Sequence, residues 1–228
     1  MEGGLKAVGG LAVVAGLLWF LWGGMERPRG EASPAGAAGS EGDWVSMVPQ
    51  DGQGAWTEAA FGGEAPARWK MGVLEVGAGA MLSGVRWEGE LPVTPYEIEL
   101  EAQRTSGADF FCGLTVPVRG AAECVTWIVG GWGGMVVGIS SIDGYDASEN
   151  ETTNYMEFDN HRWYRLRMAV RRNRLSAWID GEPVVDVDTT SKELGLRPGE
   201  IEMSAPLGLA TWQTAAGIRN VRWRRLPE

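Results

Sequence analysis

The chain has 228 residues and a formal net charge of −10 at neutral pH. This acidic balance argues against nucleic acid as a partner, because phosphate backbones are bound by basic surfaces, and it disfavours electrostatic docking onto anionic lipid. Apolar residues make up 44% of the chain, which suffices for a core, and the 34 glycines and 12 tryptophans favour an all-β domain.

The first predicted element is a membrane segment near the N-terminus. Residues 7–24 form an uncharged apolar run after Lys6, and Trp19 and Trp22 stand where interfacial aromatic residues are common. A cleaved signal peptide is the alternative, but cleavage directly after the run would place Trp22 at a position that needs a small side chain. We therefore expect residues 1–24 to be an uncleaved anchor with one transmembrane helix.

Residues 25–43 form a predicted linker that is rich in Gly, Ala, Pro, Ser and Glu. The positive charges on the two sides of the apolar run are balanced, so they do not fix the orientation of the anchor.

Cys112 and Cys124 flank a predicted turn and would suit a disulfide in an exported domain, with two buried free thiols as the alternative. We expect the domain to lie outside the cytoplasm. A zinc site is not expected, since His161 is the one histidine of the chain.

From residue 44 onward the sequence predicts strands and tight turns. Residues 96–102, which read YEIELEA, alternate between apolar side chains on one face and Glu97, Glu99 and Glu101 on the other. We expect the glutamate face to be solvated; a catalytic carboxylate pair is the alternative.

Further strands follow, joined by short turns. Residues 162–171 alternate between apolar and arginine side chains, and the later Asp180-Gly181 step is typical of a hairpin. Three tryptophans fall on positions assigned to the core: Trp163, Trp178 and Trp223. The other predicted strands lie in residues 68–77, 109–118, 123–130, 134–142, 205–213 and 218–226. Many short antiparallel strands predict a two-sheet β-sandwich of jelly-roll type over residues 44–228.

The stretch from Gly130 to Thr153 is the strongest candidate for a binding site. A glycine cluster surrounds Trp132, and an apolar segment then leads into a loop with four carboxylates: Asp143, Asp146, Glu149 and Glu151. Glycine permits close approach of a ligand, indole offers a flat apolar face, and carboxylates accept hydrogen bonds from hydroxyl groups. This combination on a β-scaffold predicts a saccharide site; a tight structural loop with a solvated acidic tip is the alternative.

Three tryptophans are candidates for stacking on a sugar: Trp132, Trp127 and Trp212. Trp132 is the best of them because glycines flank it on both sides. Trp127 shares the parity of Val125 and Val129 on one strand, which suits a core position, and Trp212 would line the same groove as Trp132.

The acidic loop also offers ligands for calcium. Asp143, Asp146, Asn150 and Glu151 carry hard oxygen donors, although their spacing is not that of an EF-hand. A structural calcium ion is therefore the alternative to a domain without cofactors.

Several segments of the chain resemble one bacterial domain family. They are YEIELEAQR from residue 96, the hairpin strands RWYRLRMAV and LSAWIDGEPVVDVDTT after residue 161, and LGLATWQTAAGIRNVRWR near the C-terminus. The likeness covers about residues 56–225, and on it the chain is similar to the 3-keto-disaccharide hydrolase family of the concanavalin A-like lectin/glucanase superfamily. The segments GGWGG and SSIDGYDASENETT resemble a membrane-anchored subgroup of planctomycete-type bacteria.

The resemblance implies a concanavalin A-like jelly roll that acts on disaccharides with a 3-keto group. Such a group acidifies the neighbouring C–H, so elimination followed by hydration needs one general base and one acid, whereas ordinary glycoside hydrolysis needs two carboxyl groups. Five side chains are the candidates for proton transfer: Asp143, Asp146, Glu149, Glu157 and His161. The glutamate-containing strand typical of the hydrolases is missing here, where residues 135–144 read MVVGISSIDG.

Two functions are consistent with these observations. One is a membrane-anchored, extracytoplasmic hydrolase of 3-keto-disaccharides in a bacterial single-pass membrane protein. The other is a noncatalytic, lectin-like module of the cell envelope that binds carbohydrate or protein. The missing glutamate strand favours the module, and the family resemblance favours the hydrolase.

Overall fold

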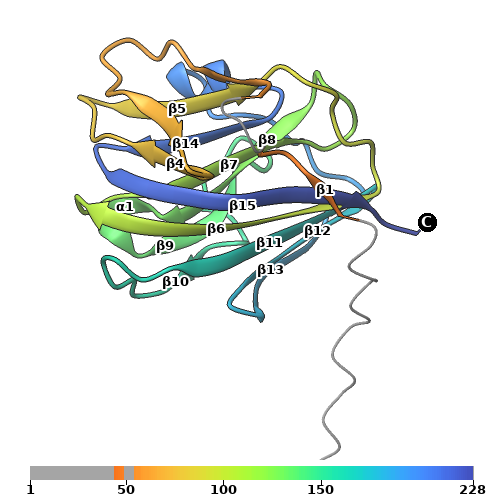
Figure 1. Ribbon diagram of the computed structural model, residues 1–228. Coiled ribbons are helices and arrows are strands. Elements are labelled where there is room, and N and C mark those ends of the chain that lie inside the picture. Colours follow the sequence, from red (N-terminus) through yellow and green to blue (C-terminus); the bar gives the residue numbers. More distant parts are fainter. Residues whose placement is uncertain (1–43, 49–53, 228) are drawn as a thin grey trace, which may run out of the picture. The chain divides into compact units, whose positions relative to one another are not determined.

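The structure, a computed structural model, describes residues 44–48 and 54–227. These residues form two antiparallel sheets packed face to face, which confirms the predicted two-sheet sandwich (Figure 1). The predicted anchor, residues 1–24, and the predicted linker, residues 25–43, lie outside this described part. Within it, no helix has the length and apolar character that crossing a bilayer requires.

One sheet has eight strands in the order β13-β12-β11-β6-β15-β4-β3, with β1 paired to β15. Its strands are β1 (Val45–Ser46), β3 (Ala67–Lys70), β4 (Val73–Val76), β6 (Tyr96–Ser106), β11 (Tyr164–Arg171), β12 (Arg174–Ile179), β13 (Glu182–Asp188) and β15 (Ala215–Arg225).

The other sheet has seven strands in the order β10-β9-β8-β7-β14-β5-β2. Its strands are β2 (Trp56–Glu58), β5 (Leu82–Trp87), β7 (Cys112–Pro117), β8 (Cys124–Gly130), β9 (Val136–Ser140), β10 (Asn154–Tyr155) and β14 (Gly208–Trp212). A short turn labelled α1 (Gly131–Gly134) and a 3-10 helix labelled η2 (Glu200–Ser204) lie in the connections.

Strand alternation supplies the core between the two sheets. On β6, Tyr96, Ile98 and Leu100 point inward and are fully buried, as the sequence pattern predicts. Leu114 on β7 and Val125 on β8 meet them from the other sheet as members of the same cluster. Burying such side chains is worth about 1.5–3 kcal/mol each, so this core is the main source of stability.

The outer face of the eight-stranded sheet differs from the prediction. Glu97 and Glu99 face outward on β6, but they are only 3% and 5% exposed and are not solvated. The guanidinium groups of Arg165 and Arg222, on the neighbouring strands β11 and β15, lie 2.6 and 2.7 Å from the Glu99 carboxylate. Arg224, which is itself buried, pairs with Glu97. The alternation thus placed the glutamates on the correct face, but arginines from other strands cover them.

Tryptophans complete this outer layer. Trp163 and Trp178 were expected in the core and lie outside it, where Arg219 and Arg167 stack on their rings at 4.0 and 4.1 Å. A cation held against the ring face desolvates an indole without placing it between the sheets. Trp223 does pack against the core.

The two cysteines do not form a disulfide. Cys112 pairs with Val129 and Cys124 with Pro117, so the thiols stand at opposite ends of the β7–β8 hairpin. Burial raises the pKa of Cys112 to about 12 and that of Cys124 to about 11. Of the two alternatives, the structure therefore shows buried free thiols, which are poor nucleophiles because the thiolate is disfavoured.

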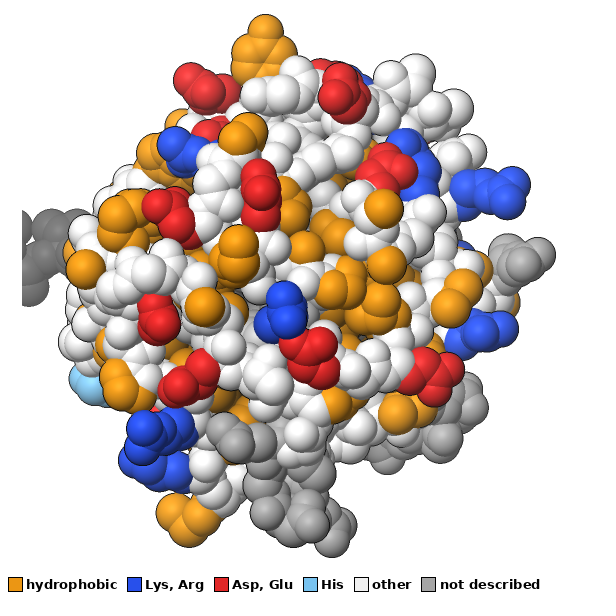
Figure 2. All heavy atoms as spheres, turned by 90° about the horizontal axis from the view of Figure 1, so that it is seen from above, with side chains coloured by type: hydrophobic (Ala, Val, Ile, Leu, Met, Phe, Trp, Pro, Cys, Tyr) orange, Lys and Arg blue, Asp and Glu red, His pale blue; other side chains and the backbone are white. Residues whose placement is uncertain are grey.

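The surface carries charges of both signs. Figure 2 shows one face of the molecule, on which acidic and basic side chains stand among apolar ones that gather near its middle. The acidic excess of the chain therefore forms no single patch on this face.

Candidate functional site

The outer face of the seven-stranded sheet carries a hollow of about 420 Å³, which we call the sheet pocket. Its lining is mostly apolar with a few polar groups: Met81, Leu82, Asp109, Phe110, Thr126, Ile128, Trp132, Ser140, Arg197, Pro198, Glu200, Ile201 and Trp212. These residues come from β5, β8, β9, β14, the α1 turn and the segment around η2. The fold therefore assembles the pocket from distant parts of the chain.

Small residues make room on this face of the sheet. One row of paired, outward-facing positions contains almost no side-chain bulk apart from one isoleucine: Gly138, Ile128, Gly113, Ala210 and Gly84. A Cβ atom added at Gly113 would lie 3.0 Å from the Phe110 ring, so glycine allows that ring to lie against the sheet. A Cβ atom added at Gly138 would likewise lie 2.8 Å from the Ala147 carbonyl oxygen, so these small residues let neighbouring segments pack closely against the sheet.

Trp132 stands at the rim of the sheet pocket on the α1 turn and is 43% exposed. Its φ of 48° lies in the left-handed region, which is rare for a residue with a side chain, and Gly133 and Gly134 continue the turn with positive φ. The Asp109 carboxylate holds the turn by accepting the N–H of Gly133 at 3.1 Å and that of Phe110 at 2.7 Å. The indole is thus presented on a fixed turn.

A second tryptophan lines the same pocket. Trp212 ends β14 opposite Leu82 of β5, and its backbone N–H donates to the Phe110 carbonyl at 3.1 Å. The sandwich therefore brings Trp132 and Trp212 together, although they are far apart in the sequence. Trp127 does not join them: it is 0% exposed in the core, because its parity on β8 points it inward, and this corrects its selection as a stacking residue.

Asp146 binds two of the side chains that line the sheet pocket. The Ser140 hydroxyl donates a hydrogen bond of 2.7 Å to Asp146, and the Arg197 guanidinium lies 3.2 Å from its other oxygen. Both partners line the pocket, whereas the Asp146 side chain is only 19% exposed. This aspartate therefore fixes the positions of a hydroxyl and a guanidinium group that face the pocket.

A lysine neutralises the tip of the acidic loop. Lys192 Nζ lies 3.0 Å from the Asp143 carboxylate and 2.8 Å from that of Glu151. The Glu193 N–H and the Lys192 ammonium lower the pKa of Asp143, so this group is a carboxylate at neutral pH and not a poised proton carrier. Asn150 donates its side-chain amide to carbonyl groups of the loop and of β9. Among the described residues, no group of three or more His, Cys, Asp or Glu side chains is placed to hold a metal ion.

The other predicted proton-transfer residues lie away from the sheet pocket. Glu149, Glu157 and His161 are exposed, and none of these described side chains lines it. The His161 N–H donates to the Arg104 carbonyl at 2.7 Å, and its φ of 63° is typical of a turn residue. The structure therefore does not bring the five predicted residues together.

Three charged residues that the sequence patterns did not single out line the pocket: Asp109, Arg197 and Glu200. Arg197 and Glu200 flank a Pro-Gly turn, and in the described part of the chain no side chain pairs with the Glu200 carboxylate. The sequence signal available for Arg197 and Glu200 was that both are charged residues beside a predicted turn. Nothing in the local sequence, however, places that turn above this sheet.

Comparison with sequence families gives one match that covers most of the chain. The model of the 3-keto-alpha-glucoside-1,2-lyase-like domain matches residues 36–224. No curated protein matches the chain.

Solved structures share the fold at low sequence identity. The carbohydrate-binding module CBM66 from Bacillus subtilis is 13% identical with a TM-score of 0.52, over 78% of this chain and 99% of that chain. A candidate glycosyl hydrolase from Parabacteroides distasonis is 12% identical with a TM-score of 0.55, over 82% and 95% of the two chains. The exoplasmic/lumenal domain of VIP36, in a form bound to Ca²⁺ and Man3GlcNAc, is 9% identical with a TM-score of 0.55, over 83% and 90%. At these identities the likenesses establish the fold alone.

Proposed function

The chain belongs to the 3-keto-alpha-glucoside-1,2-lyase-like domain family, and from this premise we propose that the sheet pocket binds a saccharide. The observation that carries the proposal is that Trp132 and Trp212 line one hollow together with Asp109, Arg197 and Glu200. Indole faces stack on the C–H faces of sugar rings, while carboxylates and guanidinium groups hydrogen-bond sugar hydroxyls.

The dimensions of the sheet pocket suit a small saccharide. Its volume of about 420 Å³ falls within the roughly 300–1,000 Å³ of small-molecule sites. Asp109 is occupied by two backbone N–H groups and positions the Trp132 turn. Glu200 and Arg197, whose side chain is 61% exposed, remain accessible to hydroxyl groups of a bound sugar.

Calorimetric titration with a panel of disaccharides tests this proposal. Trp132→Ala should weaken binding about tenfold or more, because stacking on an aromatic ring contributes on the order of 1 kcal/mol beyond the buried area. Tyr155→Ala is the matched control, since Tyr155 is an exposed aromatic residue that does not line the pocket. Binding that survives Trp132→Ala but is lost in Tyr155→Ala, or no binding to any saccharide, would contradict the proposal.

A second candidate function is elimination from a 3-keto-glucoside, and the presence of Glu200 and Arg197 in one pocket favours it. A base removes the proton at C2, which the C3 ketone acidifies. The electron pair then forms the C1–C2 double bond while the glycosidic C1–O bond breaks, and the leaving oxygen takes up a proton. We assign Glu200 as the base and Arg197 as the cation that stabilises the enolate oxygen.

Turnover of a 3-keto-glucoside tests this second candidate. Glu200→Gln should abolish turnover and leave saccharide binding within a few-fold of the wild type, because the amide cannot accept the proton. Asp143→Asn should leave turnover unchanged, since Asp143 is paired with Lys192 outside the pocket. If Glu200→Gln kept turnover and Asp143→Asn lost it, the catalytic base would instead lie in the acidic loop.

The location of the protein is also proposed from its sequence. We propose that residues 1–24 anchor the chain in a bacterial membrane and that residues 25–43 hold the domain outside the cytoplasm, because residues 7–24 are uncharged and apolar. Sedimentation with membranes, together with cleavage of the domain by protease added to intact spheroplasts, would support both statements. A chain that stays in the soluble fraction would refute the anchor.

A further inference from the structure

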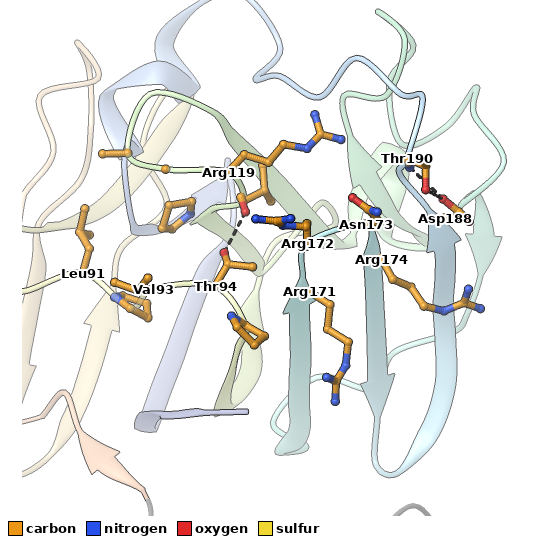
Figure 3. Close-up of a pocket in the computed structure, with 16 residues that line it drawn as sticks. Leu91, Val93, Thr94, Arg119, Arg171, Arg172, Asn173, Arg174, Asp188 and Thr190 are labelled. Atoms are coloured by element: carbon orange, nitrogen blue, oxygen red, sulfur yellow. Dashed lines mark hydrogen bonds between the residues drawn. The ribbon is translucent and has the colours of Figure 1, made fainter. Parts of the chain in front are cut away.

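A second and larger cavity lies at the other end of the β7–β8 hairpin from Trp132 (Figure 3). Its volume is about 1160 Å³, and we call it the end cavity. It is formed by residues 91–95, 117–121 and 171–174, with Asp188 and Thr190 at one side. Both sheets contribute to it, and no residue of the sheet pocket lines it.

The lining of the end cavity is basic on an otherwise acidic chain. Its charged residues are four arginines and one aspartate: Arg119, Arg171, Arg172, Arg174 and Asp188. The backbone N–H and the hydroxyl of Thr190 both donate to the Asp188 carboxylate, at 2.8 and 2.6 Å. The one carboxylate of the lining is therefore already bound and does not neutralise the arginines by direct contact.

Two of the arginines have carboxylate partners, and within residues 44–48 and 54–227 the other two have none. Arg119 pairs with Glu123, and Arg174 pairs with Asp186. Arg171 donates to a backbone carbonyl at 3.1 Å, and among the described residues neither it nor Arg172 has a carboxylate within ion-pair distance. Figure 3 shows the Arg172 side chain pointing into the cavity towards Thr94. An arginine that points into a cavity and has no carboxylate partner among the described residues favours an anion there.

The opposite wall of the end cavity is apolar. Leu91 and Val93 lie on it with prolines, and Val93 is 60% exposed. The Thr94 hydroxyl donates to the Val118 carbonyl at 2.8 Å and ties this wall to the β7–β8 turn. The cavity therefore offers an apolar surface together with the Arg172 guanidinium group, which suits a ligand with a ring body and an anionic substituent.

We propose that the end cavity is a second saccharide site, which binds a polysaccharide bearing carboxylate or sulfate groups. The guanidinium fork of Arg172 would bind the anionic group in a bidentate manner, and the apolar wall would contact the C–H face of the ring. The choice of a saccharide over other anions rests on the proposed function of the domain. In this proposal the sheet pocket binds a small sugar, and the end cavity binds an acidic polysaccharide.

Titration of the full-length chain with polygalacturonate, dextran sulfate and neutral dextran tests the proposal, at about 0.15 M salt to screen distant charges. Binding to one or both acidic polymers and not to dextran is expected, and it shows whether carboxylate or sulfate is the group bound. Arg172→Ala should weaken that binding about tenfold or more, and Arg172→Lys should weaken it less, because lysine keeps the charge without the fork. Arg68→Ala, which removes an exposed arginine from the edge strand β3, is the matched control and should bind like the wild type.

Three results would overturn the proposal. Equal weakening of polymer binding in Arg68→Ala and Arg172→Ala would mean that the overall charge of the protein attracts the polymer. Undiminished binding in Arg172→Ala would exclude the end cavity as the binding site. Arg172-dependent binding to phosphatidylglycerol vesicles, without binding to either acidic polymer, would assign the cavity to lipid. Trp132→Ala separates the two sites: it should leave binding of the acidic polymer intact, so a failure of small-sugar binding alone counts against the sheet pocket only.

Discussion

The two outer faces of the sandwich are built in opposite ways. On the eight-stranded sheet, Glu97 and Glu99 are covered by arginines of β11 and β15. On the seven-stranded sheet, the outward positions are mostly small or apolar, and an open pocket remains. A face whose charges pair with one another leaves little for a ligand to bind, whereas exposed rings beside an unpaired carboxylate do attract one.

The same contrast separates two kinds of tryptophan. Trp163 and Trp178 lie on the paired face, where guanidinium groups already cover their rings. Trp132 and Trp212 lie on the open face and line the sheet pocket. A tryptophan count therefore says little about sugar binding until the partners of each ring are known.

The largest expected effect comes from breaking the paired face. Glu97→Gln removes the charge that neutralises Arg224, whose side chain is 6% exposed. Because an unpaired buried charge costs about 3–5 kcal/mol, the free energy of unfolding should fall by about 3 kcal/mol or more. Urea denaturation followed by tryptophan fluorescence measures the loss. Saccharide affinity should not change, since the sheet pocket is on the other face.

An exposed ion pair on the same sheet provides the control. Glu75→Gln breaks the pair between Lys70 and Glu75, which are both more than half exposed. Such pairs contribute less than about 1 kcal/mol, so this variant should unfold almost like the wild type. Equal losses in Glu75→Gln and Glu97→Gln would show that burial of the glutamate layer is not what stabilises this face.

Much of the fold follows from local sequence patterns. The period-two alternation of residues 96–102 correctly placed the apolar side chains of β6 in the core and its glutamates outside. It could not show that Glu99 is buried, because Arg165 and Arg222, which bury it, stand on strands that are distant in sequence and adjacent only in the folded sheet. The glycines beside Trp132 were a local signal of an exposed turn in the same way.

The sheet pocket was harder to predict because the fold determines which polar residues are paired with other groups and which are free to bind a ligand. Asp109 precedes a strand and would be read as an ordinary turn residue, yet it holds the Trp132 turn. Asp143 stands among other acidic residues in the sequence, which suggests a site for proton transfer. Lys192, however, approaches it from a distant loop and neutralises it. Which carboxylate is paired and which is free depends on contacts between loops, and no spacing rule encodes them.

A moderate effect is expected from Asp109, which holds the Trp132 turn on the open face. Asp109→Ala leaves the N–H groups of Phe110 and Gly133 without their acceptor. Loss of these charge-assisted hydrogen bonds should lower the free energy of unfolding by about 1–2 kcal/mol and weaken saccharide binding about tenfold, because the Trp132 turn is released. Denaturation and calorimetry on the same samples test both effects, and Asp109→Asn should fall between Ala and the wild type. Undiminished affinity in Asp109→Ala would mean that the turn holds Trp132 without the clamp.

A smaller effect is expected from Asp146, which acts through its partners. Asp146→Asn keeps an acceptor for the Ser140 hydroxyl but removes the charge that holds Arg197, an exposed side chain. Stability should change by less than about 1 kcal/mol, and saccharide affinity should fall only about two- to fivefold. Glu149→Gln, on the same loop but outside the pocket, should have no effect on affinity. A loss of a hundredfold in Asp146→Asn would instead place this aspartate in direct contact with the sugar.

The smallest effect is expected at the exposed tip of the acidic loop, and it depends on pH. The Lys192 ammonium lowers the pKa of Glu151, and the Glu193 N–H together with Lys192 lowers that of Asp143. A carboxyl pKa that is lowered by folding adds stability above its unfolded value of about 4, and this stability is lost as the pH falls through the folded value. Lys192→Met should therefore lower the Tm slightly at about pH 7, and the difference from the wild type should shrink as the pH falls below about 4 and in high salt. A Tm difference that persists in acid would mean that Lys192 stabilises the loop through the packing of its aliphatic chain and not through its charge.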